Sequence, residues 1–285
     1  MSLSNREMRL TQESPAFPTE IFESILCYSS HSTLLATSAV NSTFHYITRK
    51  HLFNFISLKR TVYDHDTISR ARTLLSLLDD IPDIANCIRR IHIDCFGVDL
   101  SNADSYTKPL ITILSRLPRL NSISLRGKDS TVSSDSWLDW KATCSKLRRA
   151  FARTFSSPLV YEIKISHIYN FSLSIFLECH SLKHLSFNLV SSRRSIPSQN
   201  DLQFRPKLES LILRCSFIDG HDEENLKWLF SPQGLLDISQ LTKFIFSGDK
   251  DHAQPAHILS LCAESIKTLE LRMDPTSRFA LLSSP

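Results

Sequence analysis

The chain is 285 residues long, 42% of its residues are hydrophobic, 22% are charged, and its formal net charge is +4. Such a composition is typical of a folded soluble protein, and so small a net charge does not indicate nucleic-acid binding. Only five glycines occur, about a quarter of the usual ~7% frequency. A nucleotide-binding enzyme is therefore not expected, because its phosphate loops are built from glycine.

The cysteines and the N-terminal sequence indicate the cellular compartment in which the protein is expected. The seven cysteines are odd in number, include no Cys-x-x-Cys pair and follow no signal peptide, which is typical of a reducing environment. Residues 1–16 are polar and charged, so we expect a flexible N-terminus there. No run approaches the roughly 18 apolar residues of a membrane span. We therefore expect a cytoplasmic or nuclear protein that contacts no membrane.

Residues 17–58 predict three short helices. Pro18 suits the start of the first helix, and Ser32 and Asn41 are expected to cap the second and third. Apolar residues recur at helical spacing in each segment: Ile21, Phe22, Ile25 and Leu26, then Leu34, Leu35 and Ala39, then Phe44 and Ile47. A unit of about forty residues is marginal alone, so we expect it to share its apolar surface.

This segment resembles the F-box, whose pattern opens with Leu-Pro, continues through an apolar pair, Leu-Leu and Val, and ends in an aromatic residue and Leu-Phe. Phe17 replaces the opening Leu. The resemblance implies that residues 17–58 are an F-box that binds a Skp-type adaptor through its apolar residues. Those expected to contact the adaptor are Pro18, Ile21, Ile25, Leu26, Leu34, Leu35, Val40 and Phe44. The competing interpretation is that some of them pack only within the helical unit.

One apolar pattern then recurs along the chain: an apolar residue, two variable ones, an apolar, one variable and an apolar. Each copy predicts a short strand, because alternate residues point to the same side of a strand. The eight copies begin, at steps of 22–40 residues, at Phe53, Ile88, Leu120, Val160, Leu182, Leu208, Leu241 and Ile266.

Helical stripes separate the predicted strands. They fall at residues 68–78 and 110–117, and a capping box at Ser136 and Asp139 predicts a longer helix from there. Shorter helical pieces fit 172–179, 223–230 and 255–263. The alternation predicts an α/β fold in which residues 59–285 form an irregular leucine-rich repeat solenoid. With it the resemblance extends to F-box proteins of filamentous and mushroom-forming fungi that carry degenerate leucine-rich repeats.

Candidate chemistry in the sequence is weak. His92 and Asp94 share a strand face, yet no nucleophile motif accompanies them. Cys179, His180 and His184 resemble metal ligands, but we expect a helix-to-strand transition between them. We therefore expect neither a metal site nor a cofactor, and no enzymatic activity.

The resemblance implies a function in the ubiquitin conjugation pathway. It identifies the chain as a substrate receptor of an SCF-type cullin ligase, whose F-box binds the adaptor and whose repeats bind a target protein. The alternative is a stand-alone leucine-rich repeat scaffold without a ligase role, in which the F-box-like helices cap the first repeat.

The target is expected on the strand face that points away from the core. In each copy the variable residues lie on that face, and six of the charged ones are basic against three acidic. Such a face favours an acidic or phosphorylated target; the alternatives are a generic solvated face and a site on the inserted loops at 126–136, 190–206 and 247–255. The expected target-binding residues are Arg90, His92, Arg126, Lys164, His184, Arg214, Lys243 and Arg272.

Overall fold

The computed structural model describes residues 18–59, 67–95, 107–127, 138–193, 204–215, 224–225, 228–248 and 254–273. The chain divides into two compact units, unit 1 up to Asn54 and unit 2 from Phe55 onward. This division precedes the domain end predicted at residue 58, because residues 55–58 form a strand of the sheet in unit 2. The N-terminus predicted to be flexible, residues 1–16, lies outside the described residues, as do most of the inserted loops.

Unit 1 consists of three helices, α1 (Thr19–Leu26), α2 (His31–Ser38) and α3 (Ser42–Leu52). Asn41 caps α3 as predicted, its side-chain oxygen accepting a hydrogen bond from the Phe44 N–H at 2.9 Å. The cap of α2 is Ser30 and not Ser32, because the Ser30 backbone is extended and its hydroxyl accepts from the Thr33 N–H at 3.2 Å. The three helices enclose a small core of Leu26, Leu34 and Ile47.

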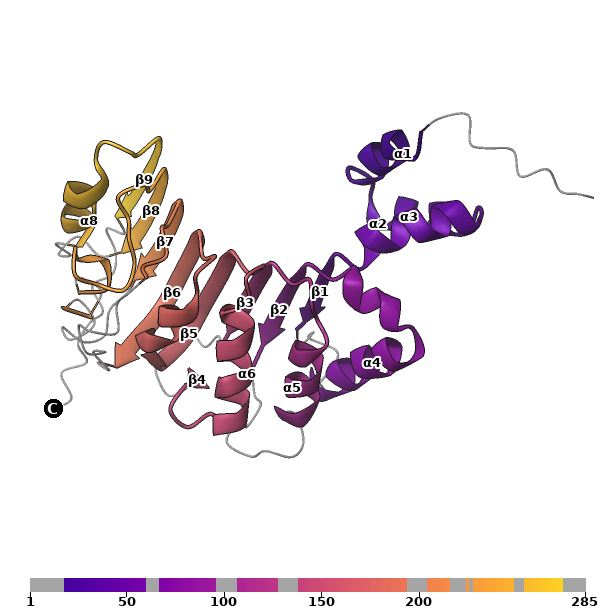
Figure 1. The fold of residues 1–285 in the computed structure, drawn as a ribbon, viewed down its shortest axis with the longest axis horizontal. Helices are drawn as coiled ribbons and strands as arrows, with labels where there is room; N and C mark the ends of the chain where they lie inside the picture. Colours follow the sequence, from indigo (N-terminus) through magenta and orange to yellow (C-terminus); the bar gives the residue numbers. More distant parts are fainter. Residues whose placement is uncertain are drawn as a thin grey trace, which may run out of the picture. The chain divides into compact units, whose positions relative to one another are not determined.

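Unit 2 contains a nine-stranded parallel sheet in which the main strands lie in the order of the sequence, β1-β2-β3-β5-β6-β7-β8-β9, as Figure 1 shows. All eight predicted strands are present. They are β1 (Phe55–Leu58), β2 (Arg90–Asp94), β3 (Ser122–Arg126), β5 (Glu162–Ser172), β6 (His184–Arg193), β7 (Ser210–Cys215), β8 (Lys243–Gly248) and β9 (Thr268–Met273). The sequence did not predict β4 (Leu138–Asp139), which pairs with β5.

The strand register aligns the apolar positions of the pattern into two rows across the sheet. One row contains Ile56, Ile91, Ile123, Ile163, Leu185, Leu211, Phe244 and Leu269. The other contains Leu58, Ile93, Leu125, Ile165, Phe187, Leu213, Phe246 and Leu271. From β2 to β8 every member of both rows is buried, so the core of unit 2 lies on this face of the sheet.

Helices cover that face. They are α4 (Thr67–Asp80), α5 (Lys108–Ser115), α6 (Ser145–Phe155) and α8 (Gln254–Cys262), with 3-10 helices η1 (Pro82–Asn86) and η4 (Leu173–Glu178). In Figure 1, α4, α5 and α6 follow one another along one side of the sheet. Each turns apolar residues inward, as Leu74, Ile113 and Phe151 illustrate. No helix in the described ranges combines the length and the apolar character that crossing a membrane would need.

The start of α6 differs from the prediction. The capping box at Ser136 and Asp139 predicts a helix from there; Ser136 lies outside the described residues, and residues 138–144 form β4 and a turn. The Asp139 carboxylate is occupied elsewhere, since it accepts hydrogen bonds from the Lys141 N–H at 2.9 Å and from the Asn170 amide at 3.1 Å. Trp140 is buried, and its ring centroid lies 5.1 Å from that of Phe171. Pairing with β5 therefore outweighs the local helix signal.

We expect substitutions at adjacent positions of β5 to differ sharply in their effect on stability. Ile163 is buried, so Ile163→Ala should lower the free energy of unfolding by about 2–5 kcal/mol through lost burial and the cavity left behind. Lys164 points to the opposite face and is exposed, so Lys164→Ala should cost less than about 1 kcal/mol. Urea denaturation followed by circular dichroism measures both; equal losses would contradict the assigned faces.

Candidate functional site

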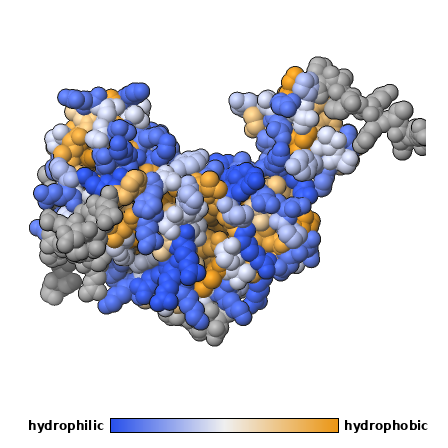
Figure 2. Space-filling view, in the orientation of Figure 1, coloured by the Kyte–Doolittle hydropathy of each residue, from blue (hydrophilic) through white to orange (hydrophobic). Residues whose placement is uncertain are grey.

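Unit 1 exposes apolar side chains that a protein in water normally buries. Ile21 is 45% exposed, Ile25 59%, Leu35 51% and Val40 67%. All four belong to the residues expected to contact an adaptor, and Pro18 beside them is also exposed. Figure 2 shows hydrophobic residues at the surface of this unit. Exposed apolar side chains in such number indicate an interaction surface.

The other predicted adaptor residues lie inside unit 1. Leu26 and Leu34 are core residues packed with Ile47. Phe44 is half-buried, and its ring meets the edge of Phe22 at a centroid distance of 5.0 Å. These three side chains hold the helices together, so the exposed surface is formed by the remaining five predicted residues.

Two tyrosines add to the exposed set. Tyr28 is 91% exposed after the end of α1, and Tyr46 is 64% exposed on α3. Neither belongs to the apolar pattern on which the F-box resemblance rests, so sequence reasoning missed them. For Tyr28 the available signal was its spacing, since it follows Ile21 and Ile25 by seven and three positions, the spacing of neighbours on a helix. An ion pair between Lys50 and Glu23 at 2.7 Å joins α3 to α1 beside Tyr46.

The eight residues expected to bind a target share the sheet face opposite the core, called here the open face. The register places them in three rows that cross the strands. Arg90, His184 and Lys243 lie in the first row, His92 and Lys164 in the second, and Arg126, Arg214 and Arg272 in the third. The structure thus brings together, on one surface, residues up to 182 positions apart between Arg90 and Arg272 in the chain.

Acidic neighbours neutralise part of the open face. Glu162 pairs with Lys164 at 2.7 Å and accepts from the Ser122 hydroxyl. Burial alone would raise the pKa of Glu162, but the hydrogen bonds from Lys164 and Ser122 and the charges of Lys164 and His184 outweigh it, so this pKa is lowered. Arg272 pairs with Glu270.

Positive charge remains at Arg214 and Lys243. Neither forms an ion pair within the described residues. Lys243 lines a shallow depression of about 460 Å³ together with Lys164 and His184, the hydroxyls of Ser186, Ser210 and Thr242, and the carboxylates of Glu162 and Glu209. This depression combines cations and hydroxyl groups, which are the groups that bind carboxylate and phosphate oxygens.

His92 is held in the second row. Its Nδ1 lies 2.9 Å from the Ser124 hydroxyl, and its Nε2 is buried without a hydrogen-bond partner in the structure. Burial is the main cause that lowers the pKa of His92, and the positive charge of Lys59 is the next. The negative charge of Asp94 opposes this shift. The positive charges of Arg126 and Lys164 add to it. His92 is therefore a neutral structural histidine, and its predicted neighbour Asp94 acts on it through charge.

Cys179, His180 and His184, which resemble metal ligands in the sequence, each contact a different group in the structure. The Cys179 thiol is buried and donates to the Ile175 carbonyl oxygen at 3.2 Å, and burial, with the nearby Glu178 charge, raises its pKa to about 12. His180 packs on Phe204 at 4.8 Å, and His184 packs on Tyr161 at 5.7 Å, both between ring centroids. Within the ranges that the structure describes, no three His, Cys, Asp or Glu side chains gather as metal ligands would.

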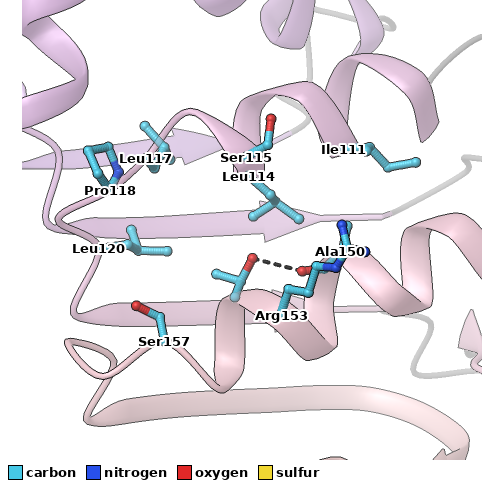
Figure 3. A pocket seen from close by; sticks show the side chains of 10 residues that line it. Ile111, Leu114, Ser115, Leu117, Pro118, Leu120, Ala150, Arg153 and Ser157 are labelled. Atoms are coloured by element: carbon cyan, nitrogen blue, oxygen red, sulfur yellow. Dashed lines mark hydrogen bonds between the residues drawn. The ribbon is translucent and has the colours of Figure 1, made fainter.

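A second hollow lies on the helical side of unit 2, between α5 and α6, with a volume of about 260 Å³. Figure 3 shows that its walls are mainly apolar, with Leu114, Leu117 and Leu120 on one side and Ala150 and Arg153 of α6 on the other. It lacks the convergent polar groups by which a ligand pocket orients its ligand.

Protonation of His92 should cost stability. Because the folded-state pKa lies below the ordinary 6.5, the unfolded chain binds the proton more readily. Neutral His92 therefore stabilises the folded protein fully above pH 6.5. This stabilisation decreases as the pH falls from 6.5 toward the lower folded-state pKa. We expect His92→Gln to lose less stability than the wild type between about pH 7.5 and about pH 5.5. Urea denaturation at both pH values measures this, and equal losses would show that His92 is not desolvated.

Known proteins offer little likeness to this chain. No protein-family model matches it, and no curated protein does. Among solved structures it is similar to a protein from Bacteroides fragilis, crystallised as a structural-genomics target, with 12% identity and a TM-score of 0.32. The match covers 76% of this chain, and the chain spans 51% of the length of that protein.

Proposed function

We propose that unit 1 is an F-box, that unit 2 is an irregular leucine-rich repeat solenoid, and that the chain is the substrate receptor of an SCF-type cullin ubiquitin ligase. One observation carries the proposal. Ile21, Ile25, Leu35 and Val40 are exposed at positions to which the F-box resemblance assigns adaptor contacts. A Skp-type adaptor is therefore the proposed partner of unit 1.

The energetics of unit 1 support a partner. Over residues 18–54 its core contains three buried apolar side chains, Leu26, Leu34 and Ile47, and a unit of this size is marginal alone. Covering exposed apolar surface contributes about 25 cal/mol per Å². An adaptor placed over Ile21, Ile25 and Leu35 would therefore stabilise the complex and the helical unit together.

The sheet of unit 2 supports the repeat interpretation. Its main strands follow one another in sequence order, helices connect many of them, and two apolar rows lie beneath the sheet. Such an arrangement is typical of repeat proteins, in which each unit buries its apolar edge on the next. The open face then offers one long surface to a target protein.

The proposed receptor performs no covalent chemistry of its own. Its contribution is to hold a target protein where a charged ubiquitin-conjugating enzyme reaches the target's lysines. Holding two reactants in place converts an encounter in solution into a local reaction, and effective molarity supplies the rate enhancement. Binding surfaces are sufficient for this role.

A stand-alone scaffold is the competing proposal. In that case the three helices would only cap the first repeat and would have no adaptor. A cap has no adaptor to bind, whereas the receptor requires one. Capture of a Skp-type adaptor therefore distinguishes the two proposals.

Adaptor binding should be lost when a charge enters the exposed apolar set. Ile21→Asp and Leu35→Asp would each bury an unpaired carboxylate at the interface, which costs several kcal/mol. Thr43→Asp is the matched control, because Thr43 is exposed in the first turn of α3, where the helix dipole favours an acid. Capture of a purified Skp-type adaptor by each folded variant measures the effect. Undiminished capture by both apolar-site variants would refute the F-box assignment.

Target binding should depend on the charge of the open face. Reversing Arg126, Lys164 and Arg214 to Glu should leave adaptor capture intact and abolish retention of an acidic or phosphorylated target. The control reverses Arg72, Arg119 and Arg153, which are exposed outside the strands, and changes the total charge equally. Mass spectrometry of proteins co-purified from cells compares the three chains.

The outcome separates the alternatives for the target site. Targets lost from the open-face variant and kept by the control support the open face. Targets kept by both variants would contradict it and place the site elsewhere on unit 2, while loss from both would reduce the effect to net charge.

A further inference from the structure

A third hollow of unit 2 lies between α6 and η4 and has a volume of about 430 Å³. One face of α6 forms one wall through Ser145, Arg148, Arg149 and Ala152. The end of β5 and η4 form the other wall through Ser172, Ser174, Ile175 and Glu178, with Trp140 between them. We call it the α6 groove. It belongs neither to the exposed apolar set of unit 1 nor to the open face.

The α6 groove has positive charge that the residues described by the structure do not neutralise. The sequence of α6, SKLRRAFARTF, includes four basic residues and no acidic one. The side chains of Arg148 and Arg149 form no ion pair within the described residues. Figure 2 shows strongly hydrophilic residues gathered over this helix. The acidic side chain at the groove is Glu178, which is exposed.

One donor in the groove is left without its hydrogen bond. The Nε of Arg148 is buried and has no hydrogen-bond partner among the residues that the structure describes. A buried unsatisfied donor costs about 1–3 kcal/mol, and more when it carries charge. Because Arg148 also lines the groove, an acceptor that enters the groove can bind its guanidinium group.

The remaining polar groups are also suited to an anion. The N-cap of α6, Cys144, forms no side-chain hydrogen bond to the first turn, and that turn contains no acidic residue, so the positive end of the helix dipole beside Ser145 is not compensated there. The hydroxyls of Ser172 and Ser174 lie 2.7 Å apart on the opposite wall. Guanidinium groups and hydroxyls facing each other across a groove form a donor set for phosphate oxygens.

We propose that the α6 groove binds a phosphate monoester, with Arg148 and Arg149 holding the phosphate group. The hollow is larger than a phosphate group alone needs, and Ala152 and Ile175 give it apolar walls for an organic portion. Glu178 lies where an amino or hydroxyl group of that portion would find an acceptor. The α6 groove contains no residue assigned to adaptor binding, so the test of one proposal does not decide the other.

Isothermal titration calorimetry on the full chain tests the proposal with three probes: O-phosphoserine, inorganic phosphate and serine. O-Phosphoserine should bind, and serine should not, because it lacks the phosphate. Arg149→Gln should weaken the binding by about tenfold or more, since hydrogen bonds to a charged group are among the strongest in proteins. Arg148→Gln should do the same, and because Arg149 is exposed, its variant keeps the test valid if Arg148→Gln fails to fold.

Lys146→Gln is the matched control. It removes the same charge from the same turn of α6, and Lys146 does not line the groove. Binding that survives Lys146→Gln and is lost in Arg149→Gln supports the site. Equal losses in both variants would reduce the effect to general electrostatic attraction and overturn it. If inorganic phosphate binds as tightly as O-phosphoserine, the assignment to a phosphate monoester is wrong. If neither O-phosphoserine nor inorganic phosphate binds, the whole proposal is wrong.

Discussion

The parallel register between neighbouring strands is the constraint on which unit 2 depends. It aligns Ile91, Ile123 and Ile163 in one row and their counterparts two residues later in another. A slip by one residue in any pair would turn apolar side chains outward and polar ones into the core. Because each buried branched side chain contacts its neighbours in the same row, the register and the core specify each other. The helices then need only supply an apolar stripe to close the layer.

The same alternation produces the open face. Once every second residue of a strand is fixed in the core, the residues between them are aligned across the sheet with equal regularity, as Arg126 and Arg214 are. Rows of similar side chains therefore form on the open face although the residues between the apolar positions vary from strand to strand. Where an acid falls beside a base within a strand, as Glu162 and Lys164 do, the charges neutralise each other; where none does, as at Lys243, the charge remains available.

The sequence predicted the strands well, because burial on alternate positions is a local property that Ile-x-Ile and Leu-x-Phe spacings record directly. It missed β4, which is too short for any period to show. It placed the start of α6 too early, since a capping-box match cannot reveal that the Asp139 carboxylate accepts a hydrogen bond from Asn170 in β5. Local pattern thus specified the elements, and tertiary pairing decided their ends.

The candidate surfaces were predictable in part for the same reason. An apolar helix stripe does not distinguish Leu34, which is buried, from Leu35, which is exposed, because both positions are apolar and only packing separates core from surface. The rows of the open face follow from strand alternation and were predictable. The α6 groove was not, because its walls come from different elements, α6 and η4, whose packing the sequence does not show, and Arg148 and Arg149 by themselves indicate an ordinary solvated helix face.

The order of strands in the sheet also bears on how this chain folds and changes over time. Each main strand pairs with the main strands adjacent to it in sequence order, so each pairing closes a loop whose length is set by one connection and not by the length of the whole chain. Because the entropic cost of closing a loop grows with its length, assembly of the sheet can spread from one strand pair to the next. A strand and its connection, gained or lost at one edge, would leave every other pairing as it was.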